Sequence, residues 1–329
     1  MKRIDTVDVF RGIALLQMIF WQILDFFSRA NIYTDAPYYF QPFNMPINGI
    51  GVGFFAFVVG VGIYLSTTKR NKIEALKHGF KRYFGYILIS LVFTTFVFGF
   101  PIFFGWEEVI QGIGLSGLIG FVLFLFVRSK KVLGVLAIIF ILFQPFILNL
   151  SYQYPQEGIV GFLVNMSSRG YFSILNILPL ILIGIIIGEY FVKKKPFKLL
   201  LILGAVLIFF SLVSHLIGFQ INYYNRSTMY SVFYLGISIL LLGLLGTILR
   251  KKENFILFRP LKTLGRGAFL GYLIHFLIIY KASVVFGFNS VFDFYPSLVF
   301  SIISVVIIYF IIKFWLHLKE KRGWKILWI

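Results

Sequence analysis

Long apolar stretches alternate with short polar or basic segments along the whole chain. Each stretch holds roughly 20 residues, the length at which an α-helix crosses a hydrocarbon core of about 30 Å. The pattern therefore predicts ten membrane-spanning helices. They are expected near residues 8–28, 47–67, 83–104, 109–127, 132–150, 171–192, 199–218, 229–249, 267–286 and 296–317.

The composition supports a membrane protein. Of the 329 residues, 59% are hydrophobic and 13% are charged, whereas soluble domains carry about 25% charged residues. The apolar stretches leave no room for a separate soluble domain. The predicted fold class is an all-α, polytopic integral membrane helix bundle, with residues 1–329 forming a single transmembrane domain. The chain has no cysteine, which excludes a cysteine nucleophile and a thiolate zinc site.

Basic residues are distributed as expected for a membrane topology. If the N-terminus is cytoplasmic, 26 of the 31 Lys and Arg residues fall in segments on the cytoplasmic side, in agreement with the positive-inside rule. Both termini are then expected in the cytoplasm, and the cell membrane is the expected location. A nucleic-acid partner would need the net charge of +19 gathered on one exposed face. The lipid bilayer is therefore the expected partner, and no nucleic acid is expected.

The first predicted helix carries a seam of polar side chains. Asp8, Arg11, Gln22, Asp25 and Arg29 are separated by steps of three and four or their sums, so they share one helical face. Buried charges are costly in a bilayer and normally face a bundle interior or a wet cavity. We expect this face to line an aqueous passage. The alternative is that the terminal residues form local ion pairs at the two membrane surfaces, but Gln22 lies between them and needs partners at depth.

Other polar residues lie inside predicted spans. His275 is near the middle of the ninth span, and a lone intramembrane histidine is a functional candidate. Gln111 opens the fourth span and Asn176 precedes Pro179 in the sixth. Either amide could instead bond to the backbone of a neighbouring helix.

Five segments resemble, in the right order, the transmembrane acyltransferase superfamily. The similarity is to the heparan-α-glucosaminide N-acetyltransferase branch and its uncharacterised prokaryotic relatives. The segments are RIDTVDVFRGIALLQMIF, NGIGVGFFAFVVGVGIYLSTTKR, VIQGIGLSGLIG, GYFSILNILPLILIGIIIGEY and PLKTLGRGAFLGYLIHFLI.

The resemblance implies transfer of an acyl group, acetyl above all, from cytoplasmic acyl-CoA to an acceptor at the outer face, often a sugar or glycan. Asp8 and Arg11 match the family's acidic and basic pair at the inner mouth. Together with Gln111 they form the expected cofactor-binding set, in which Arg11 would attract the CoA phosphates. No metal is expected.

The expected catalytic residues are His275, Gln22 and Asp25. His275 matches the histidine of a late Tyr-x-x-His segment, and it would deprotonate the acceptor. Gln22 matches a position where the family usually has His or Asn. An amide does not titrate near neutral pH, so Gln22 would orient the acyl carbonyl rather than act as a base.

The chain also departs from the family in the first outer loop, and two alternatives to an active transferase are left open. Where the heparan-acetylating branch carries an outer-loop histidine, this chain has YYFQPFNMPING, with Tyr39 near that place. A catalytically inactive relative is one alternative. The other is a proton-coupled transporter or flippase in which Asp25 or His275 carries the proton, although no two-halved repeat is evident. The acyl group, the acceptor and homodimer formation are left open.

Overall fold

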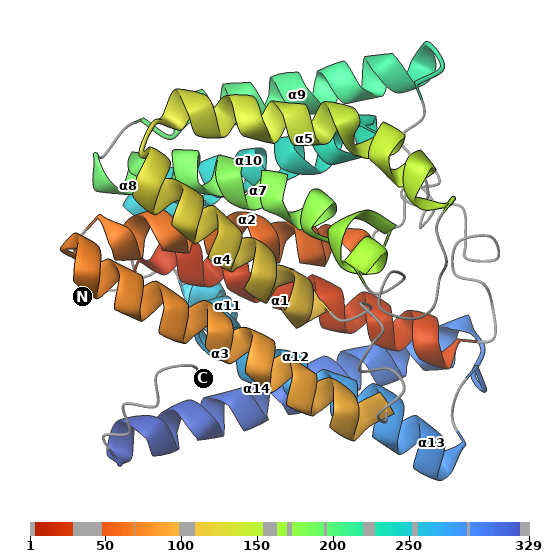
Figure 1. The fold of residues 1–329 in the computed structure, drawn as a ribbon. Helices are drawn as coiled ribbons and strands as arrows, with labels where there is room; N and C mark the ends of the chain where they lie inside the picture. The colour runs from red at the N-terminus through yellow and green to blue at the C-terminus, as the bar shows by residue number, and fades with distance from the viewer. Residues whose placement is uncertain are drawn as a thin grey trace. The chain divides into compact units, whose positions relative to one another are not determined.

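The computed structural model confirms an all-helical membrane protein. Apart from a single parallel bridge between Ser28 and Phe292, every regular element in the described part of the chain is a helix (Figure 1). The structure describes residues 4–28, 48–68, 70–98, 109–153, 163–169, 173–193, 196–219, 228–251, 256–287 and 290–322.

Eight of the described helices are long and apolar enough to cross a membrane. Two shorter apolar helices, Gly51–Thr67 and Ala268–Ile279, fall in the two remaining predicted ranges. Each of the ten predicted stretches therefore corresponds to helix, while ten as the number of crossings stays a prediction.

The chain forms two compact units. The first contains residues 1–52 and 245–329, and the second contains residues 53–244. The boundaries fall within α2 (Asn48–Thr67) and α10 (Thr228–Lys251). Each unit is described by itself.

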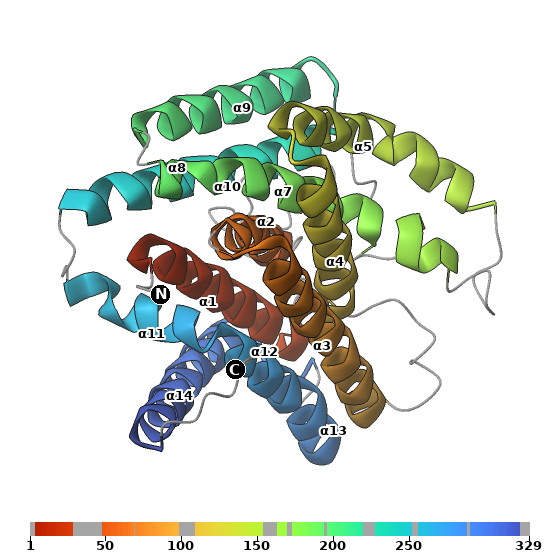
Figure 2. The ribbon, with the colours of Figure 1, turned by 60° about the vertical axis from the view of Figure 1, so that its left-hand side comes forward.

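In the first unit, α1 (Asp5–Phe27) packs against α11 (Arg259–Arg266), α12 (Ala268–Phe276) and α14 (Phe294–Lys321), as Figure 2 shows. The segment before α14 forms hydrogen bonds with the C-terminal end of α1. The backbone N–H groups of Ser290 and Phe292 donate to the carbonyls of Phe26 and Phe27 at 3.1 and 3.0 Å. These bonds satisfy carbonyl groups that a helix end leaves without an internal partner.

Residues 267–286, predicted as one helical span, are helical but not uniformly wound. The segment begins with Gly267 between α11 and α12, continues as a π-helix (η6, Leu277–Ala282) directly after α12, and ends with α13 (Ser283–Phe286). Hydropathy measures how apolar a segment is and carries no information on how its turns are wound. It therefore could not predict the π-helix. π-Turns inside helices are frequent at functional sites.

The second unit is a bundle of helices that expose large apolar side chains, as expected for contact with lipid. On α3, for example, large apolar side chains are exposed at every fourth position: Phe80, Phe84, Leu88, Val92 and Phe96. Besides α2 and α10, the long and short elements are α3 (Lys72–Phe98), α4 (Val109–Val127), α5 (Lys130–Ser151), η4 (Asn165–Arg169), α7 (Ile174–Ile187), α8 (Glu189–Val192) and α9 (Lys198–Leu216). α3 begins eleven residues before the predicted start because its first turns are polar.

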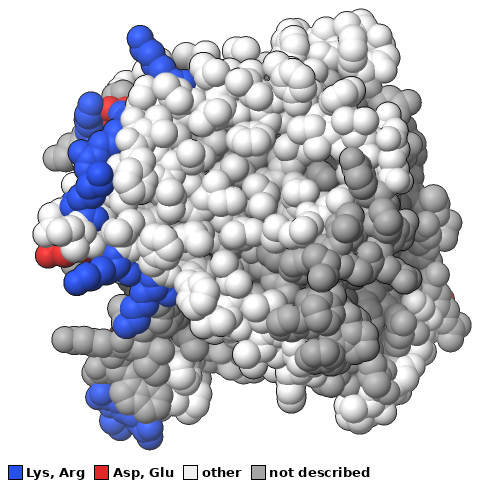
Figure 3. Space-filling model, in the orientation of Figure 1, with Lys and Arg blue, Asp and Glu red and all other residues white. Residues whose placement is uncertain are grey.

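Lysines open three helices of this unit. Lys72 begins α3, Lys130 and Lys131 begin α5, and Lys198 begins α9. Cations are disfavoured at helix N-termini by the helix dipole, whereas the positive-inside rule predicts them at one end of membrane helices. Figure 3 draws Lys and Arg in blue, and much of the described surface of the face drawn is white.

Two helices of the second unit pack with their backbones in close contact. A methyl group added at Gly60 of α2 would lie 2.0 Å from the carbonyl oxygen of Ile181, and one added at Gly184 of α7 would lie 2.0 Å from that of Phe57. Small residues allow this approach between membrane helices.

A proline in α5 is compensated by a neighbouring helix. Pro145 has no N–H to donate to the carbonyl of Ile141, four residues earlier. The hydroxyl of Thr228 at the start of α10 donates to that carbonyl at 3.1 Å. Beside it, Gln144 donates to Asn176 of α7 at 2.5 Å and accepts a hydrogen bond from Ser231 of α10 at 3.0 Å. Asn176 therefore bonds to a side chain, whereas the sequence alternative was a backbone contact.

We expect Thr228→Val to destabilise the protein by roughly 0.5–1.5 kcal/mol, because the Ile141 carbonyl would lose its partner in an apolar setting. Thr228→Ser is the matched control and should retain most of the stability, since it keeps the hydroxyl. Unfolding equilibria measured in detergent micelles or bicelles compare the three proteins. Equal stability of the valine and serine variants would contradict the role of this bond.

Candidate active site

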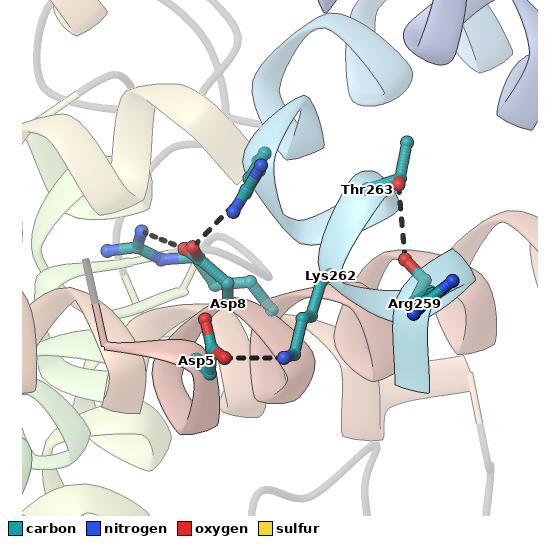
Figure 4. Close-up of polar contacts among 7 residues, drawn as sticks. Asp5, Asp8, Arg259, Lys262 and Thr263 are labelled. Carbon is teal, nitrogen blue, oxygen red and sulfur yellow. Dashed lines mark hydrogen bonds and ion pairs between the residues drawn. The ribbon is translucent and has the colours of Figure 1, made fainter. Parts of the chain in front are cut away.

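Two acidic residues at the start of α1 pair with bases on α11 (Figure 4). Asp5 forms an ion pair with Lys262. Asp8 lies 3.7 Å from the guanidinium of Arg11 and 3.8 Å from that of Arg266. The side chain of Asp8 is only 7% exposed, and a buried carboxylate is costly unless charged partners surround it.

The local Asp8–Arg11 pair was one of the sequence alternatives and is confirmed, but the partners on α11 were missed. The sequence did contain a signal for them. Acids three residues apart on α1 face bases four residues apart on α11, Lys262 and Arg266, and both spacings place side chains on one helical face.

The backbones of α1 and α11 touch where these ion pairs form. A methyl group added at Gly12 would lie 1.9 Å from the carbonyl oxygen of Leu261, and one added at Gly265 would lie 1.7 Å from that of Asp8. Only glycine fits at either position without moving a helix. The ion pairs are therefore held on two elements in direct backbone contact.

The structure brings Gln22 and His275 together. The Nε2 atom of His275 on α12 lies 2.7 Å from Oε1 of Gln22 on α1. The imidazole is fully buried, with the rings of Tyr272 and Phe276 packed edge-on against it at centroid distances of 5.0 and 4.8 Å. Gln22 thus has the partner at depth that its position in the sequence demanded.

Two proton arrangements fit these heavy atoms. The side-chain carbonyl of Gln22 can accept a proton from Nε2, or its amide can be rotated so that the NH₂ group donates to an unprotonated Nε2. Among the described residues, the buried Nδ1 atom of His275 has no hydrogen-bond partner. The arrangement with the proton on Nδ1 leaves the lone pair on Nε2, the form that a general base requires.

The middle of the seam on α1 is packed against protein. Leu15 and Met18 are both 0% exposed. A methyl group added at Gly271 of α12 would lie 2.7 Å from a terminal carbon of Leu15, and one added at Gly51 would lie 2.9 Å from Cβ of Met18. The aqueous passage expected along this face is thus closed at Leu15 and Met18 in this structure.

Asp25 lies in the last turn of α1, one turn beyond Gln22, and its side chain is outside the described part of the structure. The same holds for Arg29 and Tyr39. The structure therefore leaves the predicted role of Asp25 as it was.

Gln111 belongs to the other unit. It is buried in the first turn of α4, whereas the basic residues next to α4 in the sequence, Arg128 and Lys130, follow its other end. At 1.5 Å per residue, Gln111 lies about 24 Å from that end.

A second buried acid was also missed. Glu189 opens α8 and pairs with Lys130 of α5 and, at 2.6 Å, with Lys193. Its carboxylate raises the pKa of the Lys193 ammonium, through a hydrogen bond and through its charge. The ammonium of Lys130 also lies 5.6 Å from the centre of the Tyr64 ring.

The family model for heparan-alpha-glucosaminide N-acetyltransferase, catalytic, matches residues 3–216 of the 329. The chain belongs to this family. It is thus related to membrane acetyltransferases, as the resemblance of its opening segments suggested. A comparison with curated protein sequences gives no match.

The match to the heparan-α-glucosaminide N-acetyltransferase model contains Asp8, Arg11, Gln22, Asp25 and Gln111. It ends before α11 and α12, so His275 and the bases that pair with Asp5 and Asp8 lie beyond it. The candidate roles of these residues rest on their contacts with α1.

We expect Gly265→Ala to destabilise the protein by about 1–3 kcal/mol, the usual cost of overpacking, because the added methyl group would overlap the backbone of α1. Gly134→Ala on α5 is the control, since its methyl group would lie 3.6 Å from the nearest atom, in Ile186. That variant should be neutral or gain up to about 1 kcal/mol from helix propensity. Equal unfolding free energies for both variants in bicelles would contradict the close contact.

Proposed function

We propose that the protein transfers an acyl group, acetyl in its preferred donor, from acyl-CoA to the hydroxyl or amine of a small-molecule or glycan acceptor. The observation that carries this proposal is the 2.7 Å contact between His275 and Gln22, in a chain of an acetyltransferase family. With its proton on Nδ1, the imidazole can act as a general base through Nε2.

In the proposed reaction, Nε2 of His275 takes the proton from the attacking hydroxyl or amine. The acceptor oxygen or nitrogen forms a bond to the thioester carbonyl carbon, the carbon–sulfur bond breaks, and the CoA thiolate takes up the proton. Because the imidazole is fully buried, the acceptor reaches Nε2 by replacing the amide of Gln22. The displaced amide is then free to donate to the acyl carbonyl oxygen, where negative charge develops.

The donor phosphates are proposed to bind at the basic helix ends on the cytoplasmic side of the cell membrane. Arg11 is 26% exposed, so its guanidinium can meet a phosphate while it remains beside Asp8. Gln111 lies far from the basic end of its own helix, and for this reason it is not among the groups proposed to hold phosphates. The acceptor is proposed to enter from the outer side, near Asp25.

The experiment is acetyl-CoA turnover by the purified protein in lipid nanodiscs, with glucosamine as the acceptor probe. His275→Ala should lower kcat by about 10²–10⁴-fold, the usual contribution of a general base. Gln22→Ala should lower kcat by about tenfold or more through misorientation of the reacting groups.

His317→Ala is the matched control, because His317 is exposed near the end of α14 and should leave the rate unchanged. Turnover that survives in His275→Ala would contradict the assignment of the base. A folded wild-type protein that neither binds nor cleaves acetyl-CoA would contradict the proposed function, and proton-coupled transport would then be tested in proteoliposomes.

A further inference from the structure

We infer that the ion pairs between α1 and α11 act as a register clamp that positions His275, rather than as a binding site for the donor. The clamp consists of the pairs Asp5–Lys262 and Asp8–Arg266. This inference rests on the proposed function, since it concerns the base of that reaction.

The clamp and the imidazole lie at two ends of the same pair of elements. Three contacts follow one another along α1, and each joins it to α11 or α12. Asp8 contacts Gly265, Leu15 contacts Gly271, and Gln22 contacts His275. Gly267 alone separates α11 from α12. Gln22 is about 21 Å along α1 from Asp8 at 1.5 Å per residue. A shift at the clamp is therefore passed along α12 to the imidazole.

The glycine contacts fix how close the two helices come, but they do not fix their register. Gly12 and Gly265 meet backbone atoms, and a smooth backbone contact presents no side chain that resists sliding along the axis. Something else must hold α11 in place along α1.

The two ion pairs fix the position of α11 along α1. Asp5 and Asp8 are three residues apart, and Lys262 and Arg266 are four residues apart, so both pairs form together in one register. A slip by one helical turn, about 5.4 Å, would place Asp8 opposite Lys262 and leave Asp5 and Arg266 unpaired. The same slip would break the 2.7 Å contact between His275 and Gln22.

The burial of Asp8 also argues against a role in holding the donor. Its side chain is 7% exposed, and a carboxylate repels the phosphates that it was expected to help bind. Two guanidinium groups already face it. Asp8 is therefore assigned as a positioning residue.

The test exchanges the charges of the Asp5–Lys262 pair in the full chain, reconstituted in nanodiscs. Asp5→Lys and Lys262→Asp should each lower kcat by about 10–100-fold through misplacement of the base, with the KM for acetyl-CoA unchanged. The double exchange restores the attraction and should return kcat to within about threefold of wild type, the usual context dependence of such a pair. Lys321→Asp, an exposed lysine at the end of α14, is the charge control. If either single variant does not fold, Asp5→Asn is measured in its place, because it removes the ion pair without reversing a charge.

A second readout is independent of activity. Because the chain has no cysteine, Leu15→Cys combined with Gly271→Cys reports the register of α12 on α1 by oxidative cross-linking. Cross-linking should be efficient in the wild-type background and in the double exchange, and reduced in each single variant.

The outcomes separate the two proposals. Singles that raise the KM for acetyl-CoA at constant kcat, or a double exchange without rescue of kcat and cross-linking, would overturn the clamp. A wild-type protein without turnover, but with the expected cross-linking pattern, would overturn the proposed function and leave the clamp standing.

Discussion

The structure of the first unit depends on one constraint, the burial of Asp8 on a membrane helix. A carboxylate at that position must be surrounded by cations, and the chain supplies them from the same helix, with Arg11, and from α11, with Arg266. The glycines at positions 12 and 265 allow the approach that brings those cations near. α12 continues from α11 and places His275 beside Gln22, so the local electrostatics at one end of α1 sets the geometry at the other.

The same physical logic holds in the second unit. Glu189 is buried between lysines of two helix ends, and Gln144 links α5 to α7 and α10 through side-chain hydrogen bonds. In both units, each of these polar groups inside the bundle is satisfied by another helix. Membrane helices need such partners, because lipid offers none.

Much of the fold could be predicted from the sequence, because hydropathy and helix length are set by the bilayer. The start of α4 at Val109 and the end of α2 at Thr67 follow from apolarity alone. The π-helix after Phe276 could not be predicted, since winding leaves no hydropathic signal. Gln22 and His275 could be named as candidates because polar residues at depth are rare. Their contact could not, because it joins positions 253 residues apart through a packing that no local pattern encodes.

The central claim is that His275 is a buried imidazole held in one tautomer beside Gln22. The most direct measurement is the ¹⁵N ring chemical shifts of His275 by solid-state NMR in lipid bilayers, in wild type and in Gln22→Leu. With four histidines in the chain, a spectrum of His275→Ala assigns the signals. The account predicts a proton on Nδ1, an unprotonated Nε2, and an Nε2 signal that moves in Gln22→Leu. An Nε2 signal unchanged by Gln22→Leu, or an averaged pair of tautomers typical of an imidazole in water, would contradict it.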